Sequence, residues 1–98
     1  MADLRFEWDD GKNTRNRREH GVSFEEAKTV FYDEHALLIS DPDHSEHEDR
    51  FILLGLSGTL RTLLVSHCYG QRGDVIRIIS ARRADPQERK QYYVRWTQ

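Results

Sequence analysis

The chain has 98 residues, of which 33% are charged, and its formal net charge is −2. This length predicts one domain, 1–98, which buries about 60 to 70% of the extended chain's surface, enough for one sheet with helices packed on it. The longest apolar run, residues 51–56, has six residues, and the N-terminal sequence MADLRFEWDDGK has no apolar signal core, so we expect no membrane span and no secretory signal. Cys68 is the single cysteine, which excludes an internal disulfide and indicates a reduced, cytoplasmic protein.

Charge is distributed unevenly along the chain. Residues 70–98 contain seven Lys or Arg against three Asp or Glu, whereas residues 1–69 contain eight against fourteen. A net charge near zero argues against a nucleic-acid-binding protein, but a local excess of cations indicates contact with a polyanion. We therefore expect the C-terminal third to carry any such contact.

The first part of the chain predicts a strand and two helices. Residues 5–8 form a strand candidate. Residues 11–20, GKNTRNRREH, favour a helix with almost no apolar residue, ended by Gly21 as a left-handed C-cap, so its polar side must face water or a partner. Ser23 and Glu26 form a capping box for the second helix, whose apolar residues recur at helical spacing and predict packing on the sheet.

Four strands and a last helix follow. The predicted strands are residues 36–40, 51–56, 61–69 and 75–81. Gly58 permits a tight hairpin turn between the second and third of them. Asp85 caps the last helix, Pro86 occupies its first position and Glu88 stands three residues after the cap. This order predicts an α+β fold: a four-stranded, mainly antiparallel sheet plus a short N-terminal strand, with two N-terminal helices and one C-terminal helix.

Several segments along nearly the whole chain resemble one protein family: FEWDDGK, REHGVSFEEAKTVF, EDRFILLG, LLVSHCYGQRGDVIRIISARRA and ERKQYY. In these segments the sequence resembles the BrnT toxins of the RelE-like toxin superfamily. The resemblance implies a RelE-like fold and a toxin of a type II toxin-antitoxin operon that cleaves RNA as a metal-independent endoribonuclease, without a cofactor, and inhibits translation. It also implies messenger RNA, free or on the ribosome, as substrate. A BrnA-like ribbon-helix-helix antitoxin would neutralise the toxin in a 2:2 complex and would alone contact operator DNA.

The strand that ends in Arg82 and Arg83 holds the first candidates for chemistry. RNA cleavage without a metal needs a base for the 2′-hydroxyl proton, cations for the pentacoordinate phosphate and an acid for the leaving 5′-oxygen. The planar guanidinium suits the phosphate role. In an extended strand the two arginines point to opposite faces, with Arg77 on the face of Ile79 and Arg83. We expect one of the pair to hold phosphate and the other to contact the sheet, a helix or the antitoxin; the alternative is that both are merely solvated.

Three further side chains are catalytic candidates: His67, Glu88 and Tyr92. Glu88 and Tyr92 lie four residues apart, on one face of the last helix. Glu88 is a candidate base, or it holds an arginine, or it serves only the capping box. Tyr92 could donate a proton, stack on a nucleobase or pack in the core. His67 is the first candidate for general acid or base because histidine exchanges protons near neutral pH; the alternative is a hydrogen-bonded core residue.

Other cations are candidates for binding RNA: Lys12, Arg50, Arg77 and Arg89. Lys12 and Arg50 match positions of the family pattern, although a solvated lysine is the ordinary alternative. The segment DPDHSEHED, residues 41–49, carries five carboxylates and two histidines. A turn lacks the fixed scaffold that a metal site needs, so we expect a solvated loop that lies away from the RNA or binds basic antitoxin residues, and no metal.

Two other functions also fit the sequence. The first is a non-catalytic or weakly catalytic co-regulator that binds its antitoxin and tunes its own operon. The second is a plain nucleic-acid-binding module, which would show affinity with steep salt dependence and no cleavage. Cleavage of RNA and arrest of growth on expression separate the predicted toxin from both.

Overall fold

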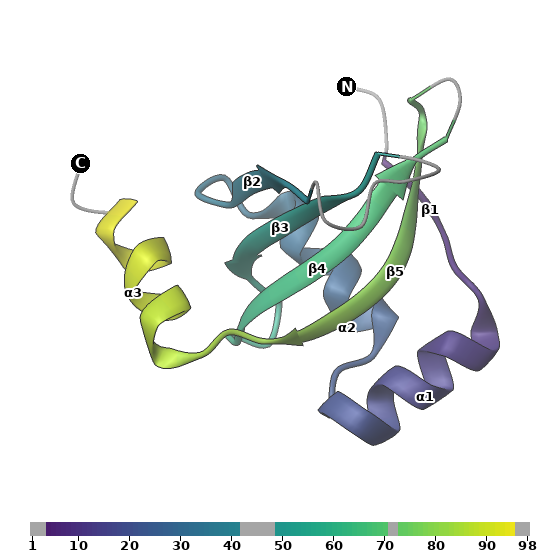
Figure 1. Ribbon diagram of the computed structural model, residues 1–98, viewed down its shortest axis with the longest axis horizontal. Helices are drawn as coiled ribbons and strands as arrows, with labels where there is room; N and C mark the ends of the chain where they lie inside the picture. The colour runs from purple at the N-terminus through teal and green to yellow at the C-terminus, as the bar shows by residue number, and fades with distance from the viewer. Residues whose placement is uncertain (1–3, 42–48, 71–72, 96–98) are drawn as a thin grey trace.

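A computed structural model of the protein describes residues 4–41, 49–70 and 73–95. In chain order the elements are β1 (Arg5–Glu7), α1 (Asp10–His20), α2 (Phe24–Thr29), the 3-10 turn η1 (Val30–Tyr32), β2 (Leu37–Ser40), β3 (Phe51–Leu56), β4 (Thr62–Tyr69), β5 (Val75–Arg83) and α3 (Pro86–Val94). The predicted α+β fold is confirmed, with the N-terminal strand as a fifth member of the sheet (Figure 1). No helix in these described ranges is long and apolar enough to cross a membrane.

The strands form one sheet in the order β1-β5-β4-β3-β2. β1 runs parallel to β5, and the other neighbours are antiparallel. Pairing between β1 and β5 ends at Glu7 and Arg77, so β1 covers only the first part of the β5 edge. Helix α1 lies beside the rest of that edge (Figure 1). The short β1 therefore leaves room for a helix at the place where β5 carries its arginines.

Two apolar cores lie on opposite faces of the sheet. On the face that packs against α2 and η1, the larger core consists of Val22, Phe24, Ala27, Val30, Leu53, Leu63, Val65, Ile78 and Ala81. On the other face, a smaller core consists of Leu54, Leu64, Ala84 and Tyr92. Figure 1 shows α2 behind the sheet and α3 beyond one end of it. Because α3 covers only part of the second face, the rest of that face is open.

β5 continues past the predicted end of its strand, through Arg82 and Arg83. Arg82 pairs with Leu64 and Arg83 with Leu63, so the two guanidinium groups leave opposite faces of the sheet, as an extended strand predicts. The expectation that Arg77 shares a face with Arg83 is wrong. The register shifts so that Ile79 has no partner on β4, and this β-bulge resets the alternation. Arg77 consequently lies on the face of Arg82.

The helix ends follow the predicted capping signals. Gly21 ends α1 with φ 68°, and its N–H donates to the Arg17 carbonyl. The Ser23 hydroxyl accepts from the Glu26 N–H at the start of α2. Asp85 and Glu88 form a complete capping box at the start of α3. These local signals set where the helices begin and end.

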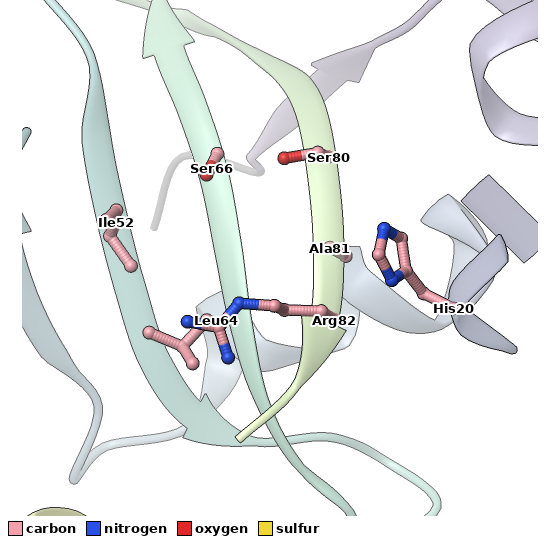
Figure 2. Close-up of a pocket in the computed structure, with 7 residues that line it drawn as sticks. All are labelled: His20, Ile52, Leu64, Ser66, Ser80, Ala81 and Arg82. Carbon is pink, nitrogen blue, oxygen red and sulfur yellow. The ribbon is translucent and has the colours of Figure 1, made fainter. Parts of the chain in front are cut away.

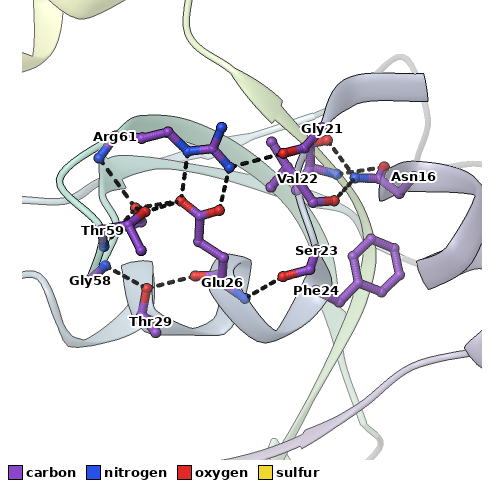
Figure 3. Close-up of polar contacts among 12 residues, drawn as sticks. Asn16, Gly21, Val22, Ser23, Phe24, Glu26, Thr29, Gly58, Thr59 and Arg61 are labelled. Atoms are coloured by element: carbon purple, nitrogen blue, oxygen red, sulfur yellow. Dashed lines mark hydrogen bonds and ion pairs between the residues drawn. The ribbon is translucent and has the colours of Figure 1, made fainter. Parts of the chain in front are cut away.

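The hairpin between β3 and β4 contains one residue in the left-handed conformation, Leu60, with φ 67°. The same hairpin changes the predicted capping box at the start of α2. Glu26 does not return its carboxylate to the Ser23 backbone but accepts hydrogen bonds from Arg61, Thr59 and the Ser57 hydroxyl (Figure 3). The Arg61 guanidinium holds the pKa of Glu26 at about 2. An ion pair with a residue 35 positions away thus replaces half of the predicted capping box.

Candidate nucleic-acid interface

The open part of the second sheet face forms a concavity beside α1, which we call the Arg82 concavity. It is lined by His20, Ile52, Leu64, Ser66, Ser80, Ala81 and Arg82. Figure 2 shows the Arg82 side chain extending across β4 toward Leu64, and the His20 ring lying beside Ala81 at the outer edge of β5. Two hydroxyls, one imidazole and one guanidinium therefore meet over an otherwise apolar floor.

A second concavity, the α1 concavity, adjoins the first. It is lined by Lys12, Arg15, Asn16, Glu19, His20, Arg50, Ile79 and Ser80. His20 and Ser80 line both concavities, so the two form one continuous surface. Across both linings there are four cationic side chains and one carboxylate. A surface with this balance attracts the phosphates of a nucleic acid.

Asn16 sets the position of α1 against the sheet. Its side-chain amide is buried and donates to the Val22 and Ala81 carbonyls, each at 2.8 Å. Its oxygen accepts from the Ala81 N–H at 3.1 Å. In Figure 3 Asn16 reaches from α1 toward Val22. Lys12 and His20 stand one helical turn before and after Asn16, so the bonds that hold Asn16 also direct these two side chains to the open face.

Glu88 holds the Arg82 guanidinium in place. Nη1 donates to Oε1 and Nη2 to Oε2, both at 2.9 Å, and Nη1 also reaches the Arg83 carbonyl. Among the residues that the structure describes, Nε and one Nη2 hydrogen have no acceptor, which leaves two donors for a ligand. Arg82 lowers the pKa of Glu88, and Glu88 raises that of Arg82. A carboxylate so engaged is a weak base, which favours the arginine-holding role among those predicted for Glu88.

Arg83 lies in a different place from Arg82. It lines a third concavity together with Leu60, Arg61, Thr62, Ala84, Arg89 and Tyr93. Arg89 there also donates to the Ala84 carbonyl at 3.0 Å. The two neighbouring arginines therefore serve different surfaces, and Arg82 is the one that shares a concavity with an imidazole.

His67 occupies the core and not the Arg82 concavity. It is fully buried, and its ring packs edge-on against Phe31 with centroids 4.7 Å apart. Its nitrogens bond the Val65 carbonyl and the Tyr69 hydroxyl. Burial lowers the pKa of His67. The prediction of His67 as the first candidate for general acid or base is corrected: His67 takes the alternative role of a hydrogen-bonded core residue, because its position on β4 directs its ring to the α2 face of the sheet.

Tyr92 is likewise buried and does not line the concavity of either arginine. Its ring belongs to the smaller core, and its hydroxyl donates to Asp33 at 2.5 Å. Asp33 is partly buried, which raises its pKa, but bonds from the Leu56 N–H and the Tyr92 hydroxyl outweigh this and lower it. Of the roles predicted for Tyr92, core packing is the one that this geometry supports.

The remaining predicted cations are divided between surfaces. Lys12 and Arg50 lie in the α1 concavity, as a role in binding RNA requires. Arg77 pairs with Glu7 at 3.5 Å across the β1–β5 junction. Most of the acidic segment, residues 42–48, lies outside the described residues.

Sequence reasoning missed His20, Arg15, Ser66 and Ser80. His20 ends a helix interpreted only as polar, and its spacing from Lys12 and Asn16 is the signal that could have found it. The serines had no comparable signal, because they join the site only through the register of β4 and β5, in which Ser66 faces Ser80.

Comparison with known proteins assigns the family. A family model described as "Ribonuclease toxin, BrnT, of type II toxin-antitoxin system" matches residues 8–88. Among solved structures, the 1.1 Å crystal structure of the Brucella abortus ribonuclease toxin BrnT is similar in fold, with a TM-score of 0.63 and 21% identity, covering 85% of this chain and 99% of that one. No curated protein matches the chain. The predicted family is thereby confirmed: the chain belongs to the BrnT family, the ribonuclease toxins of type II toxin-antitoxin systems.

Proposed function

We propose that this chain is an endoribonuclease that cleaves RNA without a metal ion, by attack of a ribose 2′-hydroxyl on the adjacent phosphodiester, in the Arg82 concavity. Family membership supports ribonuclease activity. The observation that supports the Arg82 concavity as the site of cleavage is the geometry of the Arg82 guanidinium. Glu88 fixes it by two hydrogen bonds, and two of its N–H donors are not used by the described residues. A preorganised cation of this kind stabilises the charge that develops on phosphate oxygens in the transition state.

The surrounding charges suit a polyanion that lies across the open face. Lys12, Arg15 and Arg50 line the α1 concavity, next to Arg82 along the same surface. Cations in a row contact successive phosphates and give affinity without base specificity. In this proposal the three bind the RNA backbone on one side of the phosphate that Arg82 holds.

Cleavage of RNA in the presence of EDTA tests the mechanism. The purified protein should produce 2′,3′-cyclic phosphate and 5′-hydroxyl ends. Arg82→Ala should lower the cleavage rate about 100- to 1,000-fold, the usual cost of one lost transition-state donor. Arg83→Ala is the matched control, because it removes the same group one residue away from a different concavity. A need for magnesium, or equal losses in the two variants, would contradict the proposal.

We also propose a ribbon-helix-helix antitoxin as the partner. Membership in a type II toxin-antitoxin family implies an antitoxin, and the sequence resemblance supports this class of protein. Expression of the chain alone should arrest growth, and co-expression of the adjacent open reading frame should restore it. Co-purification followed by light scattering would give the stoichiometry, for which two copies of each chain are expected. An adjacent frame with no effect on growth arrest would refute this partner.

A further inference from the structure

Of the three histidines that the structure describes, only His20 shares a concavity with Arg82. His67 is buried in the core on the α2 side of the sheet. His35 precedes β2, where its carbonyl accepts from Arg95 near the end of α3. His20 instead lines both the Arg82 concavity and the α1 concavity, and it is exposed to solvent. It is therefore the imidazole within the described chain that an RNA lying on both concavities would meet.

The fold places His20 by a specific contact. Asn16, one helical turn earlier, is bonded to both the N–H and the carbonyl of Ala81, the residue directly before Arg82. The last turn of α1 is thus tied to the strand that carries the phosphate-binding arginine. Gly21 then ends the helix in a left-handed conformation, so the chain turns away and leaves the His20 ring at the concavity (Figure 2).

We infer that His20 is the general base of RNA cleavage, an inference that rests on the function proposed above. Its neutral imidazole takes the proton of the 2′-hydroxyl as the 2′-oxygen bonds to phosphorus. The bond between phosphorus and the 5′-oxygen breaks, and the leaving 5′-oxygen takes a proton from water at this open site. The imidazolium then returns its proton to the resulting hydroxide. The products are a 2′,3′-cyclic phosphate and a 5′-hydroxyl, with no net change in protons.

The groups around His20 come from three parts of the chain. Arg82 faces it from β5 and Arg50 from the residue before β3, while Lys12, Arg15 and Glu19 belong to α1 itself. The cations bind phosphate in the proposed complex. Among these side-chain types, histidine is the one suited to proton transfer near neutral pH, so a pH dependence of cleavage in that range is assigned to the imidazole.

The test is single-turnover cleavage of an RNA oligonucleotide in EDTA from pH 5 to 8.5, with wild type, His20→Gln and the control His35→Gln. For wild type and His35→Gln the rate should rise with pH and level off as histidine loses its proton. His20→Gln should be slower by about 100- to 10,000-fold at pH 7.5 and should lack that rise. The affinity of His20→Gln for an oligonucleotide with a 2′-deoxy residue at the cleaved position, which cannot be cleaved, should differ from that of wild type by less than about threefold, a small change in binding free energy. Added imidazole should restore part of the rate of His20→Ala.

The outcomes separate the inference from the function on which it rests. If wild type cleaves in EDTA and His20→Gln cleaves equally fast, or more slowly with the same pH profile, His20 is not the base and the endoribonuclease proposal stands. Loss of rate that follows loss of affinity for the 2′-deoxy oligonucleotide would make His20 a binding residue and overturn the inference. No cleavage by wild type in EDTA would overturn both.

Discussion

Where α1 contacts the sheet, Asn16→Ala is expected to be among the substitutions that most reduce the free energy of unfolding. β1 pairs with β5 only as far as Arg77, so the backbone groups of Ala81 have no strand partner on that edge. Asn16 supplies both a donor and an acceptor to Ala81 and a second donor bond to Val22. In Asn16→Ala all three backbone groups lose this partner.

The expected cost follows from the number and burial of these bonds. Asn16 is 6% exposed, so water does not fully replace it. An average hydrogen bond contributes about 1 kcal/mol, and a buried group left unsatisfied costs about 1–3 kcal/mol. Three such bonds predict a loss of about 3 kcal/mol in the free energy of unfolding. For a domain of this size that loss lowers the melting temperature by about 12–24 °C. A total stability of about 5–15 kcal/mol leaves the variant folded.

Urea denaturation of wild type and Asn16→Ala at pH 7 measures this cost. Asn13→Ala is the matched control, since Asn13 lies on the same helix and makes two bonds, one to the Phe24 N–H and one to the Glu25 carboxylate. It should lose about 2 kcal/mol, at about 1 kcal/mol for each bond. Amide hydrogen exchange gives a local readout, because the Ala81 N–H should exchange faster in Asn16→Ala and not in Asn13→Ala.

A specific result would refute this reasoning. If Asn16→Ala loses less than about 1 kcal/mol, water satisfies the three backbone groups and the amide is not what ties α1 to β5. Equal losses in the two variants, with unchanged protection of the Ala81 amide, would lead to the same conclusion. The position of His20 would then need another explanation.

Three other predictions concern groups that the structure places away from the proposed chemistry. Tyr92→Phe should lose about 1.5–3 kcal/mol in urea denaturation, because its hydroxyl donates to a carboxylate, while the rate of RNA cleavage per folded molecule stays unchanged. Burial lowers the pKa of His67, so the unfolded state binds more protons below pH 6.5 and the stability of the fold falls as pH falls. In His67→Gln the melting temperature should therefore depend less on pH between pH 7 and 5 than it does in wild type. Glu26, with its pKa lowered from 4.5 to about 2, contributes stability that is present above pH 4.5 and lost toward pH 2. Glu26→Gln should therefore cost about 1–2 kcal/mol at pH 7, after allowance for solvent screening, and little at pH 2, which acid titration of unfolding would check.

The sequence by itself determined the features that depend on near neighbours along the chain. Gly21 as the end of α1, Ser23 as the start of α2 and Asp85 as the start of α3 were all predicted, because capping involves residues within about four positions of each other. Alternation of side chains along an extended strand likewise placed Arg82 and Arg83 on opposite faces. The family could also be predicted, since its motifs extend over nearly the whole chain.

Only the tertiary structure decided which side chains meet. The bulge at Ile79 moved Arg77 to the face of Arg82, and the register of β4 sent His67 into the core. Asn16 and Ala81, separated by 65 positions, bring His20 beside the strand of Arg82. Strand register and the docking of a helix depend on the summed packing and hydrogen bonding of distant segments, for which the local pattern carries no signal.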